Sequence, residues 1–177
     1  MNILAKGLIK GLILTAALAI AGCTNPDRFG GDKSALGAGA NGLNGGIVPG
    51  SASDPTSPAY FQATVGDRVL FAVDQSTLTP EGRAVLDGQA GWLMSNTAYT
   101  AIIEGHADEQ GTREYNIALG ARRATAVQDY IISRGVSGGR LKTISYGKER
   151  PIEVCSEESC YSRNRRAVTV LAAGLGS

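Results

Sequence analysis

The sequence predicts an α+β fold, a two-layer α/β sandwich in which helices cover one face of a small mixed four-stranded sheet. Between residues 69 and 172, short β-prone apolar runs and helical patterns follow one another in the order β-α-β-α-β-β. The composition also changes near residue 59, because residues 24–58 contain few large apolar residues. We therefore expect one folded domain of residues 59–177.

The first β–α unit begins with the apolar run 69–73, Val-Leu-Phe-Ala-Val, which is typical of a strand. Thr79 and Pro80 are residue types favoured at the N-cap and at the first position of a helix. Glu81 adds the negative charge that a first helical turn favours. These signals predict a helix that ends near Met94.

The remaining elements are predicted from the same kinds of pattern. Residues 100–104 form the second predicted strand, and a helical pattern over about 113–134 ends at Gly135. Two further β-prone runs, 141–146 and 167–172, complete the predicted sheet. Strands and helices in this order favour a two-layer arrangement.

The second predicted helix has two adjacent stripes that differ in character. The core stripe consists of Ile117, Ala124, Val127 and Ile131. Asn116, Leu119 and Arg123 form the second stripe along one edge of it, whereas Arg122 points towards water. Arg123 is thus positioned to face the loop before the helix. The alternative for Arg123 is a surface side chain that extends its charge into solvent.

The N-terminal segment 1–22 has the features of a secretory signal. Lys6 and Lys10 supply a positive region, and the apolar run 11–22 is too short to span a bilayer. Residues 20–23, Ile-Ala-Gly-Cys, resemble the bacterial lipoprotein box, in which the cysteine is lipidated and becomes the mature N-terminus. The resemblance implies a membrane anchor at the N-terminus.

Cys23 is the residue that would carry the lipid, and two or three acyl chains anchor a protein stably where one does not. In many Gram-negative lipoproteins that stay in the inner membrane, aspartate follows the lipidated cysteine. This chain has Thr24 at that position, which indicates sorting to the outer membrane. Residues 23–58 are rich in Gly, Ala, Ser, Asn and Pro, and we interpret them as a flexible tether. A packed, loop-rich subdomain is the alternative.

Cys155 and Cys160 are the two remaining cysteines, and they flank a polar, turn-like loop of residues 156–159. Export places them in an oxidising compartment, so we expect a disulfide that closes this small loop. A zinc site would need a second pair of ligands, and a redox-active pair would be spaced more closely.

The stretch 104–116 collects polar residues where a strand passes into a helix. Glu104, His106 and Asp108 alternate, so a continuing strand would place them on one face, as in acid–base catalysis or a metal site. The chain has one histidine and no evident nucleophile with a base, which disfavours both an enzyme and a metal site. We interpret His106 as a structural residue whose ring bonds nearby backbone.

Charge narrows the classes of partner. The chain has 17 Lys and Arg against 16 Asp and Glu, and this balance argues against nucleic acid. The segment 161–166 has three arginines in four residues. Such a run is usually a solvated surface, although it also suits an anion or a partner protein.

Several short motifs occur in a fixed order along the C-terminal part of the chain. They are Glu104-Gly105-His106-Ala107-Asp108-Glu109, Gly111-Thr112, Glu114-Tyr115-Asn116, Leu119-Gly120, Arg122-Arg123-Ala124, Ser145-Tyr146-Gly147-Lys148-Glu149 and Asn164-Arg165-Arg166-Ala167. With them, residues 68–172 resemble the OmpA-like peptidoglycan-binding domain family, and within it the peptidoglycan-associated lipoproteins. The resemblance implies an OmpA C-terminal-like fold and a binding domain without enzymatic activity, cofactor or metal.

The resemblance also implies a ligand and the residues that hold it. The ligand is the peptide stem of peptidoglycan, bound at meso-diaminopimelate, whose free end carries one ammonium and one carboxylate. Asp108 and Arg123 match the acid and the arginine that grip these two groups. The other implied ligand-binding residues are Asn116, Leu119, Phe71, Asp74, Gly111 and Thr112.

The resemblance further implies partners and a location. The protein is expected in the periplasm, anchored to the outer membrane by its lipid, with a role in envelope integrity and cell division. TolB and other Tol system components are its expected protein partners, and segment 161–166 is a candidate contact for TolB. Gln110 and Arg113 depart from the family pattern, which usually has Arg and Pro there.

Overall fold

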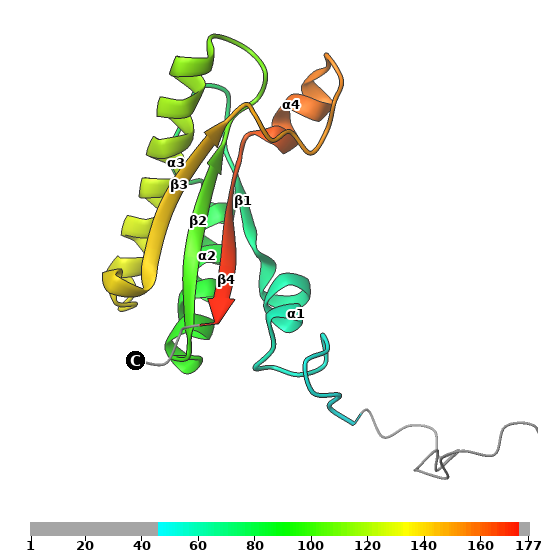
Figure 1. Cartoon of the computed structure of the whole chain (residues 1–177), viewed down its shortest axis with the longest axis vertical. Coiled ribbons are helices and arrows are strands. Elements are labelled where there is room, and N and C mark those ends of the chain that lie inside the picture. Colours follow the sequence, from blue (N-terminus) through cyan, green and yellow to red (C-terminus); the bar gives the residue numbers. More distant parts are fainter. Residues whose placement is uncertain (1–45, 174–177) are drawn as a thin grey trace, which may run out of the picture. The chain divides into compact units, whose positions relative to one another are not determined.

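The computed structural model describes residues 46–173 of the chain (Figure 1). The predicted signal segment, the predicted lipid site Cys23 and most of the predicted tether lie outside the described residues. The helices are α1 (Pro58–Tyr60), α2 (Pro80–Ser95), α3 (Arg113–Ser133) and α4 (Glu158–Asn164), with a π-helical segment Phe61–Gly66 and a 3₁₀ turn Gly138–Arg140. The strands are β1 (Arg68–Leu70), β2 (Tyr99–His106), β3 (Leu141–Gly147) and β4 (Arg166–Ala173).

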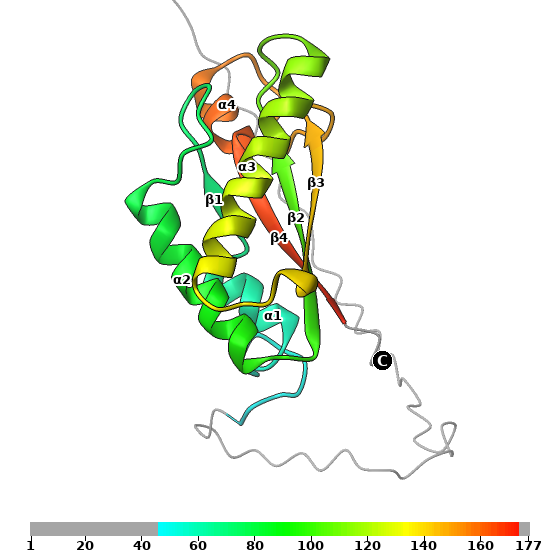
Figure 2. The ribbon, with the colours of Figure 1, turned by 90° about the vertical axis from the view of Figure 1, so that its left-hand side faces the viewer.

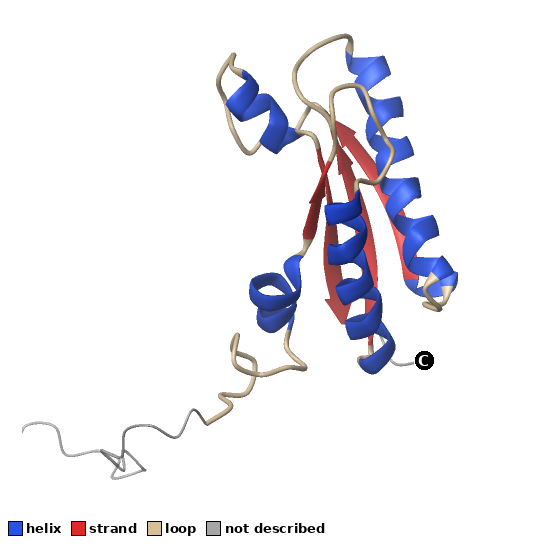
Figure 3. Cartoon of the chain, turned by 180° about the vertical axis from the view of Figure 1, so that it is seen from behind, coloured by secondary structure: helices blue, strands red, loops and turns tan. Residues whose placement is uncertain are grey.

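The four strands form one mixed sheet in the order β1-β4-β2-β3. β4 runs antiparallel to β1 and to β2, and β2 runs parallel to β3. Helices α2 and α3 lie on the same face of this sheet (Figure 3). The predicted α+β sandwich with a small mixed four-stranded sheet is confirmed.

The predicted start of α2 is confirmed by its capping geometry. Thr79 has extended backbone, and its hydroxyl accepts a hydrogen bond from the backbone N–H of Gly82 at 3.1 Å.

The first strand is shorter than predicted, because β1 ends at Leu70 and Asp74 adopts the left-handed conformation with φ of 57°. The chain therefore leaves the sheet early and forms a loop, 71–79, beside the end of β2.

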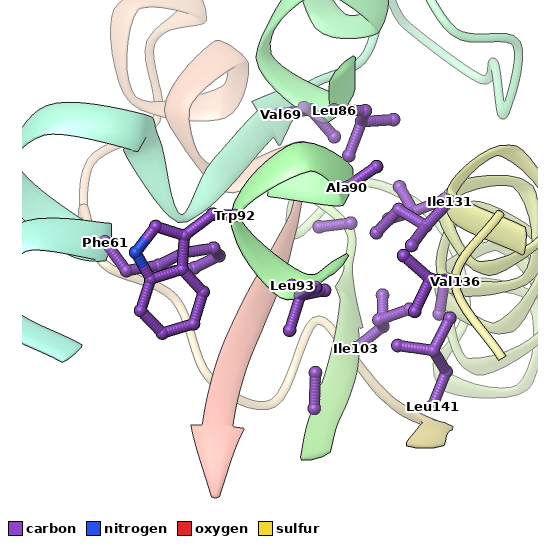
Figure 4. Packing of buried hydrophobic residues seen from close by; sticks show 14 of the residues in the cluster. Phe61, Val69, Leu86, Ala90, Trp92, Leu93, Ile103, Ile131, Val136 and Leu141 are labelled. Carbon is purple, nitrogen blue, oxygen red and sulfur yellow. The ribbon is translucent and has the colours of Figure 1, made fainter. Parts of the chain in front are cut away.

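The apolar core lies between the two long helices and the sheet (Figure 4). Leu93, Ile103 and Ile131 are fully buried in it. At one margin the rings of Phe61 and Trp92 pack at a centroid distance of 5.0 Å. The indole N–H of Trp92 donates to the carbonyl oxygen of Pro55 at 2.8 Å, so residues just before α1 also contact this core.

Helix α3 lies unusually close to β2 where two glycines face each other. A Cβ added at Gly105 would overlap the carbonyl oxygen of Gly120, and one added at Gly120 would lie 2.8 Å from the carbonyl oxygen of Gly105. Neither position has room for a methyl group. This contact fixes the height of α3 above the sheet, one turn before Arg123.

Within residues 46–173, no helix combines the length and apolarity that a membrane crossing requires.

Candidate functional site

A cavity of about 260 Å³ lies where loop 71–79 and the loop that joins β2 to α3 meet the start of α3. These loops lie at the same end of the sheet as α4 (Figures 1 and 2). Its lining residues are Val73, Asp74, Asp108, Gln110, Gly111, Tyr115, Asn116, Leu119 and Arg123. Six of the eight residues predicted to bind a ligand therefore surround one cavity, and the exceptions are Phe71 and Thr112.

Asp108 is 7% exposed, and both of its carboxylate oxygens already accept one hydrogen bond. The backbone N–H of Gln110 donates to Oδ1 at 3.2 Å, and Arg165 Nη1 donates to Oδ2 at 3.0 Å. A carboxylate can accept about four hydrogen bonds, so both oxygens keep capacity for a further donor. Asp108 can accordingly receive a cationic ligand in the cavity.

Arg123 is fully buried, so the alternative of a solvent-extended side chain is wrong. Its guanidinium donates to three backbone carbonyls, those of Gln75 at 2.8 Å, His106 at 2.8 Å and Ala72 at 3.2 Å. The first and third acceptors belong to loop 71–79, which Arg123 thereby holds against β2. Burial lowers the pKa of Arg123 to about 10, so the side chain remains cationic at neutral pH.

Phe71 and Thr112 support the cavity without lining it. The ring of Phe71 lies under the guanidinium of Arg123, with 5.2 Å between the Arg123 Cζ and the ring centroid. A cation over an aromatic face is stabilised by the negative face of the ring. Thr112 is the N-cap of α3, and its hydroxyl accepts from the backbone N–H of Tyr115 at 3.2 Å.

The loop before α3 is fixed by side chains that reach its carbonyl groups. Asn116 Nδ2 donates to the carbonyl oxygen of Gln110 at 2.7 Å. Lys148 Nζ donates to the carbonyl of Gly111 at 2.6 Å and to that of Glu109 at 3.3 Å. Gly111 has φ of 87°, which favours glycine at this turn. The departure at Gln110 therefore leaves a well-held backbone.

Tyr115 lines the cavity, although sequence reasoning did not single it out. Its hydroxyl donates to the carboxylate of Asp74, so the two residues bridge loop 71–79 and α3. This hydrogen bond to Asp74 raises the pKa of the Tyr115 phenol. No sequence signal would have found the bridge, because it depends on the left-handed conformation of Asp74.

His106 is buried beside the site, as expected of a structural histidine, but its ring does not bond nearby backbone as predicted. Among the described residues neither ring nitrogen has a hydrogen-bond partner, and Nε2 lies 3.6 Å from Glu104 Oε2. Burial, and to a lesser degree the charges of Arg166 and Arg150, lower the pKa of His106 to about 4. The ring is thus neutral at physiological pH. Within residues 46–173 no group of three His, Cys, Asp or Glu side chains could hold a metal ion.

The predicted disulfide between Cys155 and Cys160 is confirmed. The following segment differs from a solvated run of arginines, because residues 158–164 form helix α4 and both Arg165 and Arg166 are buried. Arg165 contacts Asp108, and Arg166 donates to the carbonyl oxygens of Asn164 at 3.3 Å and Arg150 at 3.1 Å. Among the three arginines, Arg163 alone remains exposed.

Comparison with known proteins identifies close relatives. The model of the OmpA family matches residues 70–165. The peptidoglycan-associated lipoprotein of Rhizobium meliloti is 51% identical over 166 residues, which cover 94% of this chain and 88% of the relative. That of Pseudomonas aeruginosa is 40% identical over 173 residues, with 94% and 97% covered. These relatives are named as lipoproteins and not as enzymes, in agreement with the predicted absence of catalytic activity.

Solved structures give the same result. The peptidoglycan-associated lipoprotein from Burkholderia pseudomallei has a TM-score of 0.60 at 34% identity, and the match covers 67% of this chain and 97% of that one. The C-terminal domain of Helicobacter pylori MotB has a TM-score of 0.57 at 19% identity, with 62% and 86% covered. At that identity the likeness concerns the fold alone.

Proposed function

Because the chain belongs to the OmpA family, and within it to the peptidoglycan-associated lipoproteins, we propose that it binds peptidoglycan non-covalently and ties the outer membrane to the cell wall. The proposed ligand is the peptide stem, recognised at meso-diaminopimelate. The observation that carries the proposal is the convergence of Asp74, Asp108, Asn116, Leu119 and Arg123 on one cavity. Asp74 comes from loop 71–79, which is distant in sequence from the β2–α3 loop and from α3, where the other four residues lie.

The chemistry of the cavity suits a zwitterion. The free end of meso-diaminopimelate carries an ammonium group, for which Asp108 supplies a carboxylate with unused acceptor capacity. It also carries a carboxylate, and Arg123 supplies the positive charge. Three of the five N–H groups of Arg123 can satisfy its three carbonyl acceptors, so two stay available to a ligand at the cavity wall.

The remaining cavity residues have supporting roles in this proposal. Leu119 is buried and offers apolar contact to the methylene chain of diaminopimelate. Gly111 and Thr112, at the N-terminus of α3, place backbone N–H groups and the positive end of the helix dipole near the ligand carboxylate. Phe71 acts beneath Arg123 rather than on the ligand.

The proposed location is the periplasmic side of the outer membrane. In this proposal, residues 1–22 direct export, Cys23 carries the lipid, and residues 23–58 connect the anchor to the binding domain 59–177. Support comes from the lipoprotein-box resemblance and from the names of the relatives.

TolB and other Tol system components are the proposed protein partners, with a role in envelope integrity and cell division. The candidate contact for TolB in segment 161–166 is narrower than expected, because Asn164, Arg165 and Arg166 are buried. Arg163 is the exposed cation of this segment, and its Nη1 lies 2.7 Å from Glu153 Oε1. Helix α4, which carries Arg163, lies at the end of the sheet where the peptidoglycan site is proposed (Figure 1).

Asp108→Ala tests the proposed function directly. Isolated sacculi are incubated with the protein, pelleted, and washed with free meso-diaminopimelate as competitor. We expect the wild type to sediment and to be released by the competitor, and we expect Asp108→Ala to lose at least about tenfold in bound fraction. The melting temperature should fall, because the buried guanidinium of Arg165 loses a buried ionic partner, so bound fractions are compared well below the melting temperature of the variant.

Asp129→Ala is the matched control, since Asp129 is an exposed acid on α3 outside the cavity. It should bind sacculi like the wild type. A wild type that does not sediment with sacculi would contradict the proposed function. An Asp108→Ala variant that still binds would show that Asp108 does not hold the ligand.

A further inference from the structure

Asp108 shares its cationic neighbour with a second acid. The Nη1 group of Arg165 donates a hydrogen bond to Asp108 Oδ2 at 3.0 Å, and the same nitrogen lies 3.3 Å from Glu158 Oε2. Its Nη2 donates to Glu158 Oε1, and its Nε donates to the carbonyl of Phe71 at 3.2 Å. Both carboxylate oxygens of Glu158 therefore contact Arg165, whereas Asp108 contacts it with one oxygen.

This division decides the charge that a ligand meets at Asp108. An arginine paired with Asp108 alone would neutralise the carboxylate that has to receive an ammonium group. With Glu158 present, the group of three side chains carries a net charge of −1, and Arg165 is turned chiefly towards Glu158. Glu158 thereby keeps negative potential available at the cavity.

Glu158 is poorly held by its own ion pair. Its side chain is 65% exposed, and an ion pair at that exposure contributes little to stability. Its position must come from the backbone of the first turn of α4. The Cys155–Cys160 disulfide closes the loop that contains Glu158 and restricts that backbone.

The rest of α4 has an anchor that does not depend on the disulfide. Asn164 is fully buried, and its Oδ1 accepts from the backbone N–H groups of Ile152 at 2.9 Å and Glu153 at 3.2 Å. Its Nδ2 donates to the carbonyl of Glu153 at 2.8 Å. Loss of the disulfide should free the first turn of α4 without detaching its end.

We propose that Glu158 and Arg165 are positioning residues for Asp108, and that the Cys155–Cys160 disulfide holds Glu158 in the place where it strengthens binding of an ammonium-bearing ligand. The inference rests on the proposed function of the Asp108 cavity. The disulfide thereby contributes to the affinity for the ligand.

The test uses the exported full-length protein in detergent and a soluble peptide stem that ends in meso-diaminopimelate, titrated by calorimetry. Glu158→Gln should weaken binding about fivefold, the effect of removing one charge several ångströms from the ammonium group. Glu157→Gln is the matched control, because Glu157 is an exposed acid on the same loop and none of the ion pairs among the described residues includes it. It should stay within about twofold of the wild type.

Two further measurements separate a charge effect from a general structural one. The Cys155→Ser/Cys160→Ser variant should also weaken binding, and adding Glu158→Gln to it should cause little further loss, because both changes act through Glu158. The ratio between wild type and Glu158→Gln should shrink as salt rises from about 0.05 M to about 0.5 M.

The outcomes are distinguishable. If the wild type binds and Glu158→Gln matches Glu157→Gln, the inference is overturned while the proposed function stands. Losses that multiply between Glu158→Gln and the cysteine variant would also overturn it, since the disulfide would then act independently of Glu158. A wild type that does not bind the stem contradicts the proposed function and the inference together.

Discussion

The two ends of the sheet are both buried, but they are built from opposite chemistry. At the end near α1, Phe61, Trp92 and Leu93 pack against other apolar side chains. At the end near α4, Arg123 and Arg165 are buried among backbone carbonyls and carboxylates. The first end stabilises the fold by removing apolar surface from water. The second end contributes less to stability, because burying charged groups costs free energy, but it holds charged side chains in fixed positions around a cavity.

Arg123→Met should have the largest effect, because it changes both stability and binding. Methionine fills a similar volume but leaves the carbonyls of Ala72, Gln75 and His106 without their donor. We expect the free energy of unfolding to fall by about 3–5 kcal/mol, measured by urea denaturation, and sacculus binding to be lost.

The control for this variant is Arg122→Met, its exposed neighbour on α3. It should change the free energy of unfolding by less than about 0.5 kcal/mol and leave binding intact. Equal costs for the two variants would show that the polar end does not depend on the carbonyl contacts of Arg123.

Leu93→Ala is the corresponding probe of the apolar end. Leu93 is fully buried, so we expect a loss of about 3 kcal/mol in the free energy of unfolding. Binding of sacculi by the folded fraction should not change, because the cavity lies at the other end of the sheet. A loss of affinity in this variant, measured well below its melting temperature, would mean that the two ends are coupled.

Acid should lower the free energy of unfolding through His106, which is buried at the polar end of the sheet. The pKa of His106 is about 4 in the fold and near 6.5 in the unfolded chain, so between these values the unfolded chain binds more protons. The stability present above pH 6.5 is therefore lost as the pH falls towards 4. From pH 7.5 to pH 5 we expect a loss of about 2 kcal/mol from this residue.

The measurement compares denaturation of the wild type and His106→Gln at each pH, so that other titrating groups cancel. The advantage of the wild type should shrink by that amount in acid. A difference that does not depend on pH would mean that His106 is hydrated or paired in solution.

The helix starts of α2 and α3 were largely predictable from sequence, because their signals are local. Thr79 and Pro80 mark the start of α2, and the periodicity over 113–134 predicts α3 closely. The same periodicity places Asn116, Leu119 and Arg123 on one stripe, and all three line the cavity. A stripe derived from helical geometry therefore carried part of the site.

The rest of the polar end depends on contacts between residues far apart in sequence. Arg165 and Arg166 appear as a solvated charge run, because nothing near them shows that Asp108 or the carbonyl of Arg150 lies opposite. Helix α4 is short, so its few residues give no clear period. The left-handed turn at Asp74 has no sequence signal of its own, so the Tyr115 bridge was also missed.

The Gly105–Gly120 contact has a kinetic consequence. Because α3 and β2 are packed backbone against backbone at that point, lifting α3 would open a void in the close packing. We therefore expect the cavity to open through loop 71–79, which is held by hydrogen bonds from Tyr115 and Arg123. We expect the lifetime of a bound peptide stem to be set by how often those hydrogen bonds break, and thus the grip on the cell wall under load to be a property of one loop.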